Sequence, residues 1–139
     1  LMNESGDPKI RKEDTDMSIF TKRAYEEYDP GDGYRVLVDR LWPRGISKEH
    51  AGIDEWLKEA APSDELRKRY HEGSIGWSDF RRIYLSELKP HREKLRRLVG
   101  LARTQNVTLV YSSKNRERNN AVVMRQYLHM LAPPRTRRI

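Results

Sequence analysis

Two short apolar segments, each followed directly by a polar loop, do most to restrict how this chain can fold. They cover residues 34–38 and 107–111 and are rich in the β-branched and aromatic residues typical of strands. Their nearly continuous apolar character indicates burial on both faces, as in a parallel sheet with helices on each side. Helical patterns separate the two segments. The sequence therefore predicts one α/β domain, with a small, mainly parallel sheet flanked by about four helices.

The other elements follow from periodicity and from the residues that interrupt it. Ser63 is a favourable N-cap for one helix, and Pro90 separates two later ones. Residues 53–61 fit one face of a helix but are few and end at Pro62, so their structure is left open. The predicted elements are a strand at 18–24, a turn at 29–33, and helices at 63–71, 77–89, 95–102 and 121–131.

Composition limits the size of the domain and the classes of chemistry. A chain of 139 residues can form one domain with a modest core. We expect a disordered leader at residues 1–16, the domain at 17–132 and a basic tail at 133–139. No apolar segment approaches transmembrane length, so we expect a cytoplasmic protein with no membrane partner. The absence of cysteine excludes thiolate catalysis, and neither the histidine spacing nor any motif predicts a metal or a cofactor.

The formal net charge of +7 favours anionic partners. Most of the basic residues lie at helical spacing among carboxylates, where a solvated helix face is the usual explanation. The sequence contains no zinc finger, no aromatic RNA-binding strand motif and no glycine-rich KH loop. Nucleic acid therefore remains an alternative partner rather than the first expectation.

The loop at residues 39–45 is the first candidate site. It contains Asp39, Arg40, Trp42 and Arg44, and arginine is suited to bidentate binding of carboxylate or phosphate. We expect Asp39 to orient the arginines and Trp42 to form a wall of the pocket or stack on a ring. The alternative is structural: Asp39 pairs with one arginine, and Trp42 covers the sheet edge.

The second polar loop, residues 112–120, opens the last helix. A helix N-terminus offers free backbone N–H groups to an anion, and Lys114 would add a full charge. The alternative is that Asn119 or Asn120 only caps the helix. Ligands of open α/β sheets bind outside the carboxyl ends of the strands, so the two loops should share one cleft if their strands are neighbours. The predicted ligand-binding residues are Asp39, Arg40, Trp42, Arg44, Tyr111, Lys114, Asn119 and Asn120.

One further carboxylate, Glu87, lies on the same side of its predicted helix as Tyr84 and Ile83. A buried carboxylate needs a partner, and Arg40 or Arg44 is a candidate. The alternative is a solvent-facing Glu87.

The motifs also resemble a known family, the YeaO-like branch of a bacterial domain of unknown function (number 488). The resemblance runs from about Met17 to Leu131. It implies an α/β fold and no established reaction. The matching segments are residues 34–45, 56–63 with Leu66 and Arg67, then Phe80, Tyr84, Glu87 and Leu88, and lastly 107–111 and 119–124.

The resemblance also implies a difference at the candidate site. Relatives commonly have a histidine at the position of Asn120 and often an aspartate near Asn115. An amide cannot act as a general base, although it can donate a hydrogen bond. If the family performs acid–base or metal chemistry there, this chain would bind without turnover, so the sequence leaves open whether it is an enzyme.

The sequence thus supports two classes of function. The first is a protein that binds a small phosphate- or carboxylate-bearing ligand, as a binding protein or as an enzyme. The second is a nucleic-acid-associated or regulatory module that uses the basic helices and tail. Binding through many phosphates falls steeply with salt, whereas binding of a small anion in a pocket falls gently, so a salt titration separates them.

Overall fold

The computed structural model describes residues 17–133. The predicted leader at 1–16 and all but Pro133 of the predicted tail lie outside these residues. The strands are β1 (Ile19–Arg23), β2 (Tyr34–Leu37), β3 (Glu55–Trp56) and β4 (Val107–Tyr111). The α-helices are α1 (Lys48–Ala51), α2 (Asp64–His71), α3 (Trp77–Leu88), α4 (Arg92–Ala102) and α5 (Asn120–Leu131). Single 3-10 turns are η2 (Pro30–Asp32), η3 (Lys58–Ala60) and η4 (Lys89–His91).

All four strands are parallel and lie in the order β1-β4-β2-β3. Tyr34 is paired with Val107, and Leu37 with Val110. The two apolar segments of the sequence therefore form adjacent central strands, as predicted. Because adjacent parallel strands run in one direction, the loops that follow β2 and β4 emerge at the same edge of the sheet.

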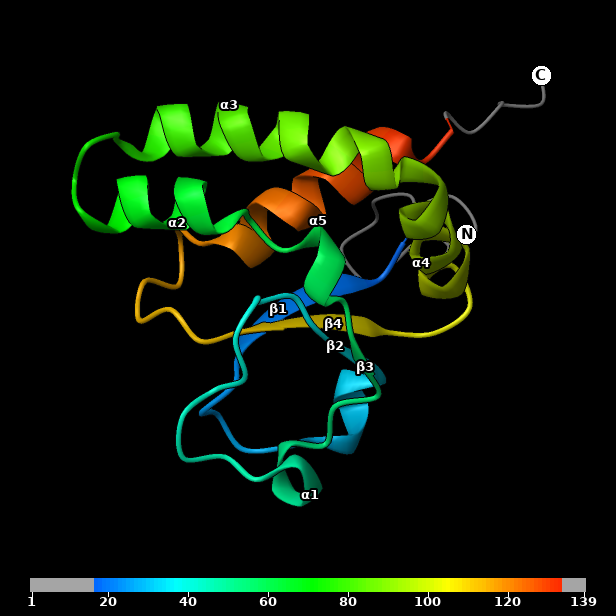
Figure 1. Cartoon of the computed structure of the whole chain (residues 1–139). Helices are drawn as coiled ribbons and strands as arrows, with labels where there is room; N and C mark the ends of the chain where they lie inside the picture. Colours follow the sequence, from blue (N-terminus) through cyan, green and yellow to red (C-terminus); the bar gives the residue numbers. More distant parts are fainter. Residues whose placement is uncertain (1–16, 134–139) are drawn as a thin grey trace, which may run out of the picture.

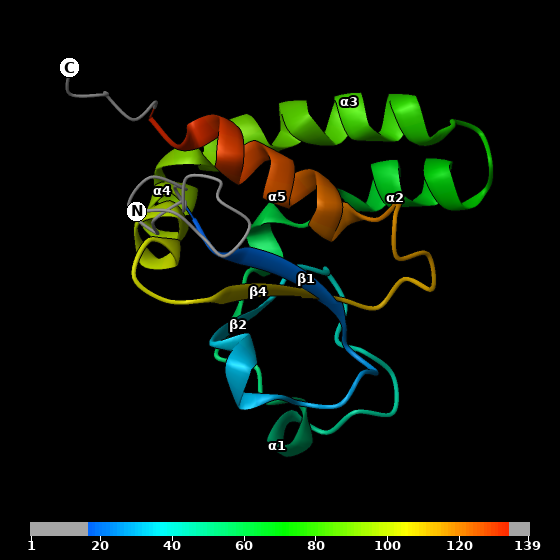
Figure 2. The same cartoon turned by 180° about the vertical axis from the view of Figure 1, so that it is seen from behind.

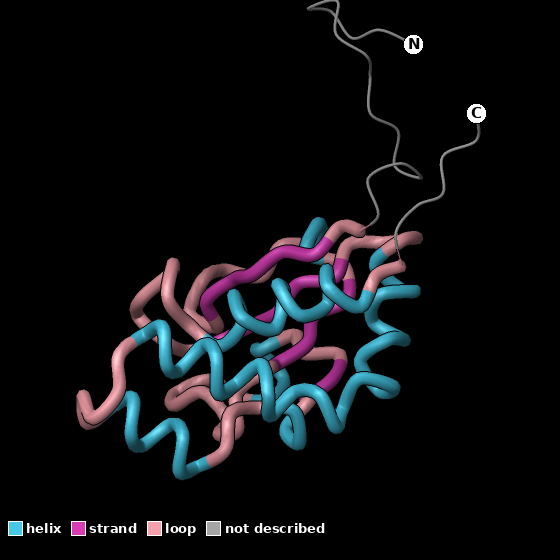
Figure 3. Tube along the Cα trace, turned by 90° about the horizontal axis from the view of Figure 1, so that it is seen from above, coloured by secondary structure: helices cyan, strands magenta, loops and turns pink. Residues whose placement is uncertain are grey.

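The principal helices α2, α3, α4 and α5 all lie on one side of the sheet (Figures 1 and 2). Viewed from above in Figure 3, the long helices overlie the strands. On this side Val36, Val38, Val107, Leu109 and Tyr111 pack into one hydrophobic core with the buried residues of the helices. The predicted α/β domain with a parallel sheet and four principal helices is confirmed, but these helices share one side: β4 is buried throughout, and its second face is covered by loops, η2 and the four-residue α1.

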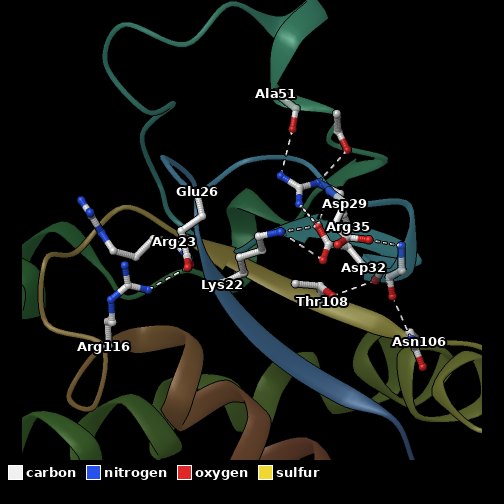
Figure 4. A network of polar contacts seen from close by, with 12 residues as sticks. Lys22, Arg23, Glu26, Asp29, Asp32, Arg35, Ala51, Asn106, Thr108 and Arg116 are labelled. Carbon is white, nitrogen blue, oxygen red and sulfur yellow. Dashed lines mark hydrogen bonds and ion pairs between the residues drawn. The ribbon is translucent and has the colours of Figure 1, made fainter.

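A buried charge organises that second face. Arg35 is only 2% exposed and forms an ion pair with Asp32, which also binds Lys22 at 3.0 Å. The Arg35 guanidinium donates further hydrogen bonds to the carbonyl oxygens of Ala51 and Gly52, at 3.0 and 3.1 Å (Figure 4). A buried guanidinium is costly unless it is paired and hydrogen-bonded, and here every contact also ties a loop to the sheet.

The segment at residues 53–61, which the sequence left open, is not a helix. Asp54 and Leu57 donate backbone hydrogen bonds to Arg35 and Leu37, both at 2.9 Å, so the chain runs beside β2 as the short edge strand β3. The turn η3 then leads to Ser63, whose side chain caps α2 as predicted.

None of the helices in residues 17–133 is long and apolar enough to cross a lipid bilayer.

Candidate functional site at the carboxyl edge of the sheet

The loops after β2 and β4 are joined by direct hydrogen bonds at the carboxyl edge of the sheet. The Ser112 backbone N–H donates to Asp39 Oδ2 at 2.9 Å. The Asn120 side-chain amide donates to Asp39 Oδ1 and to the Val38 carbonyl oxygen, both at 2.9 Å. The two loops are therefore in direct contact, although they lie far apart in the sequence, and the expectation that they form one ligand cleft stays a prediction.

Asp39 is the ionisable centre of this cluster. Burial raises the pKa of the Asp39 carboxyl, while the hydrogen bonds from Asn120 and Ser112 and the nearby charge of Arg67 oppose that rise. The Ser112 hydroxyl lies beside the carboxylate, but its oxygen is buried and forms no hydrogen bond of acceptable geometry with a described residue. Asp39 is thus held as an acceptor, and one polar atom next to it is unused.

Arg40 does not pair with Asp39, contrary to both sequence-based interpretations of this loop. Its Nε and Nη2 donate to the carbonyl oxygens of Pro62 and Ala61, at 3.1 and 3.2 Å. Its only carboxylate neighbour among the described residues is Asp64, at 3.8 Å. Arg40 therefore fastens the first loop to the chain entering α2, because guanidinium nitrogens satisfy carbonyls that precede the helix.

Arg44 and Lys114 are both exposed at the rim of this edge. The Arg44 carbonyl oxygen accepts a hydrogen bond from the Tyr25 hydroxyl at 3.0 Å, which fixes the backbone of Arg44. Neither side chain forms an ion pair with another residue of the described chain. These two side chains, the rim cations, therefore carry charges that no carboxylate among residues 17–133 pairs with.

Trp42 is half-buried beside the site rather than pointing into it. Its indole N–H donates to the Ile46 carbonyl oxygen at 2.6 Å, and its ring meets Trp56 edge-to-face at 5.4 Å. The Trp56 indole in turn donates to the Asp39 carbonyl oxygen at 2.7 Å. The two indoles thus support the backbone of Asp39, and the expected role of Trp42 as a pocket wall or stacking surface stays a prediction.

Two of the predicted ligand-binding residues serve the fold. Tyr111 packs in the core and is 2% exposed. Asn119 is 3% exposed and caps α5, since its side-chain oxygen accepts from the Val122 N–H at 3.0 Å. Capping was the alternative that the sequence left open for either asparagine, and it applies to Asn119, whereas Asn120 points at Asp39.

Within the described chain Glu87 pairs with neither Arg40 nor Arg44, and it is half-buried rather than solvent-facing, so neither alternative left open by the sequence applies. Its carboxylate accepts from the Ser63 backbone N–H at 2.8 Å and from the Ser63 hydroxyl at 2.6 Å. The neighbouring Tyr84 hydroxyl donates to the Ala60 carbonyl oxygen at 2.6 Å, and burial raises the pKa of Tyr84 well above its usual value. These contacts hold the start of α2, which carries Arg67, against α3.

Sequence reasoning overlooked the roles of Ser112, Ser63 and Arg67 at this edge. Ser63 had a usable signal, because an N-cap serine can bind a carboxylate as well as its own helix. No local sequence pattern predicts a role for Ser112 or Arg67, because their proximity to Asp39 depends on which loops the fold brings together. Among residues 17–133 no three His, Asp or Glu side chains are grouped to hold a metal ion. The edge offers hydrogen-bond donors and cations around one partly buried acid, Asp39.

Comparison with known proteins places this chain among bacterial relatives. A family model described as "Inactive DUF488-N3 subclade" matches residues 18–134. The uncharacterized protein YeaO of Escherichia coli (strain K12) is 47% identical over 115 residues, which cover 83% of this chain and 100% of that protein. The uncharacterized protein Rv3073c of Mycobacterium tuberculosis (strain H37Rv) is 40% identical over 113 residues, covering 80% and 93% of the two chains. No solved structure matches the chain.

Proposed function

The chain belongs to the inactive DUF488-N3 subclade, and from that premise we propose that it binds a small phosphate- or carboxylate-bearing molecule without converting it. The binding site is the carboxyl edge of β2 and β4. The observation that carries the proposal is the pair of rim cations, Arg44 and Lys114, which have no described carboxylate partner although they flank loops that are hydrogen-bonded to each other.

The charge around this edge supports an anionic ligand. Arg67 and Arg40 extend the rim towards α2, where Asp64 is the only carboxylate that pairs with either of them among the described residues. Both oxygens of the Asp39 carboxylate accept hydrogen bonds from neutral groups, the Ser112 backbone N–H and the Asn120 side-chain amide. Charge-assisted hydrogen bonds from arginine and lysine are the usual means of binding phosphate and carboxylate groups.

Binding without turnover follows from the side chains at the centre of the edge. The amide of Asn120 can donate a hydrogen bond but cannot carry a proton between substrate and solvent. Asp39 is an acid with a raised pKa, but both of its oxygens already accept hydrogen bonds. The description of the subclade as inactive agrees with this interpretation of the residues.

A thermal-shift screen tests the proposal with four defined anions: pyrophosphate, AMP, a sugar phosphate and citrate. An anion present at a hundred times its dissociation constant should stabilise the protein by about 2.7 kcal/mol. Lys114→Ala and Arg44→Ala should each abolish that stabilisation. Both residues are exposed, so the ligand-free variants should melt within a few degrees of the parent protein.

Matched controls are Lys89→Ala and Arg92→Ala, which remove the same charges from exposed positions on other elements. These should leave the ligand-induced stabilisation unchanged. Stabilisation that survives both rim substitutions, or the lack of stabilisation by any of the four anions, would contradict the proposal.

A second candidate function, nucleic-acid binding, rests on the net charge of +7. A titration with random duplex and single-stranded RNA at two salt concentrations separates it from the first. Binding to many phosphates should weaken with a slope close to the number of contacts, and it should survive Arg44→Ala. Binding of one small anion should depend weakly on salt and should be lost in that variant.

A further inference from the structure

A second feature of the molecule, remote from the carboxyl edge, is a surface hollow between α3 and α5. The two helices lie side by side on the outer side of the domain (Figures 1 and 2). The hollow encloses about 390 Å³. Its lining consists of Arg81 from α3 and, from α5, Val122, Arg125, Gln126, His129 and Met130.

The hollow is cationic and its charge is not neutralised locally. The lining contains no carboxylate, and α5 has no acidic residue anywhere along its length. On the other helices, three exposed arginines pair with a carboxylate three residues before them: Arg67 with Asp64, Arg82 with Asp79 and Arg96 with Glu93. Arg125 and His129 are instead one turn apart on the same face, an arrangement that does not favour the helix when both are charged.

One cation of the hollow is held in a fixed position. Arg81 donates from Nε to the Gln126 side-chain oxygen at 2.7 Å, which joins α3 to α5. The remaining nitrogens of this guanidinium form no ion pair with another described residue. A guanidinium that is already oriented loses less conformational entropy when it binds a carboxylate.

The hollow also has an apolar side. Met130 is one of the large apolar side chains that the fold leaves in solvent, at 59% exposure. Val122, about two helical turns before it on α5, also lines the hollow. Arginine and methionine are enriched in protein–protein interfaces, whereas lysine, glutamate and aspartate are depleted, and the lining follows this composition. It contains no lysine and none of the Phe, Tyr or Trp rings that form the usual stacking platform for single-stranded nucleic acids.

We propose that the hollow between α3 and α5 is a docking surface for an acidic segment of another protein, with carboxylates that bind Arg81 and Arg125 and an apolar side chain that packs on Met130. Charge complementarity selects the acidic partner. The apolar contact distinguishes it from a simple polyanion. This surface shares no residue with the carboxyl edge, so it stands whether or not a small anion binds there.

The test uses the full chain and a fluorescein-labelled peptide with glutamate and leucine at helical spacing, followed by fluorescence anisotropy. Arg125→Glu should weaken binding about tenfold, because an attraction becomes a repulsion. The matched control is Arg92→Glu, the same change in net charge at an exposed position on α4, which should weaken binding no more than about twofold, since distant charges are screened. Met130→Ser should weaken binding of this peptide and leave an all-glutamate peptide unaffected.

Three results would overturn the proposal. The first is no binding of the peptide, and the second is an equal loss in the Arg125 and Arg92 variants, which indicates a general effect of net charge. The third is tighter binding of a single-stranded RNA of equal charge that is insensitive to Met130→Ser, which would assign the hollow to nucleic acid.

Discussion

Removing the side-chain amide of Asn120 should lower the free energy of unfolding and change its dependence on pH. This amide donates to Asp39 Oδ1 and to the Val38 carbonyl oxygen, both at 2.9 Å. A hydrogen bond to a charged acceptor contributes about 1.5–3 kcal/mol and a neutral one about 1 kcal/mol. Asn120→Ala should therefore lower the free energy of unfolding at neutral pH by roughly 3 kcal/mol.

The loss should depend on pH, and its sign follows from the pKa of Asp39. Burial raises this pKa in the folded protein, so between the unfolded and folded pKa values the folded state binds a proton that the unfolded chain has released. The free energy of unfolding then falls as the pH rises through that interval. Without Asn120 the pKa of folded Asp39 rises further, so the free energy of unfolding decreases by a larger amount over a wider pH interval. The variant should lose least below the interval, where Asp39 is protonated in both states, and most above it.

Urea denaturation of both proteins between about pH 4 and pH 8 measures this difference. Asn119→Ala is a matched control, because it removes a neighbouring cap hydrogen bond and should cost about 1 kcal/mol with no comparable pH dependence. In an Asp39→Asn background the pH dependence of the Asn120→Ala effect should vanish. Equal losses at every pH, or the same pH dependence without the Asp39 carboxyl, would refute the reasoning.

Three other substitutions have definite expected outcomes. Arg35→Met should lower the free energy of unfolding by about 3–5 kcal/mol, since it leaves Asp32 and the carbonyl oxygens of Ala51 and Gly52 without their buried partner. Arg96→Met removes an exposed ion pair and should cost less than about 1 kcal/mol. Similar urea midpoints for the two variants would refute a buried role for Arg35. Trp42→Ala should lower the free energy of unfolding by about 3 kcal/mol, because it removes the ring packed on Trp56. Trp42→Phe keeps a ring and loses only the indole hydrogen bond, so it should lower it by about 1 kcal/mol. Equal losses in thermal unfolding would contradict this prediction. Asn120→His should place an imidazole against Asp39, and the carboxylate should raise the pKa of the imidazole, so that NMR shows its protonation at a higher pH than in the urea-unfolded chain. The stability that this pairing adds is present at acid pH and is lost as the pH rises through the folded pKa of the imidazole. An unchanged imidazole pKa would contradict this prediction.

Local patterns in the sequence determined the two central strands and the principal helices. The apolar runs at 34–38 and 107–111 predict the two central strands because a strand buried on both faces needs apolar side chains at successive positions. Ser63 and Asn119 mark helix starts because a cap bonds to backbone only two or three residues away. These signals depend on neighbours in the chain, so one sequence is enough to read them.

The partners of the long polar side chains were decided by the tertiary structure alone. Asp39 binds Asn120 and Ser112 instead of an arginine next to it in the sequence, and Glu87 binds Ser63. A flexible side chain can reach any group that folding brings within about 3 Å, and the sequence does not say which group that is.

The two faces of the sheet show the same limit. Continuous apolar strands predict that both faces are covered, but not by what: the helices cover one face, and loops held by the buried Arg35 cover the other. An arginine inside an apolar strand was a signal that it must have a partner, because a buried charge without one is too costly to keep. Only the folded chain shows that the partners are Asp32 and the carbonyls of Ala51 and Gly52, since these lie on loops whose paths are set by the packing of the whole domain.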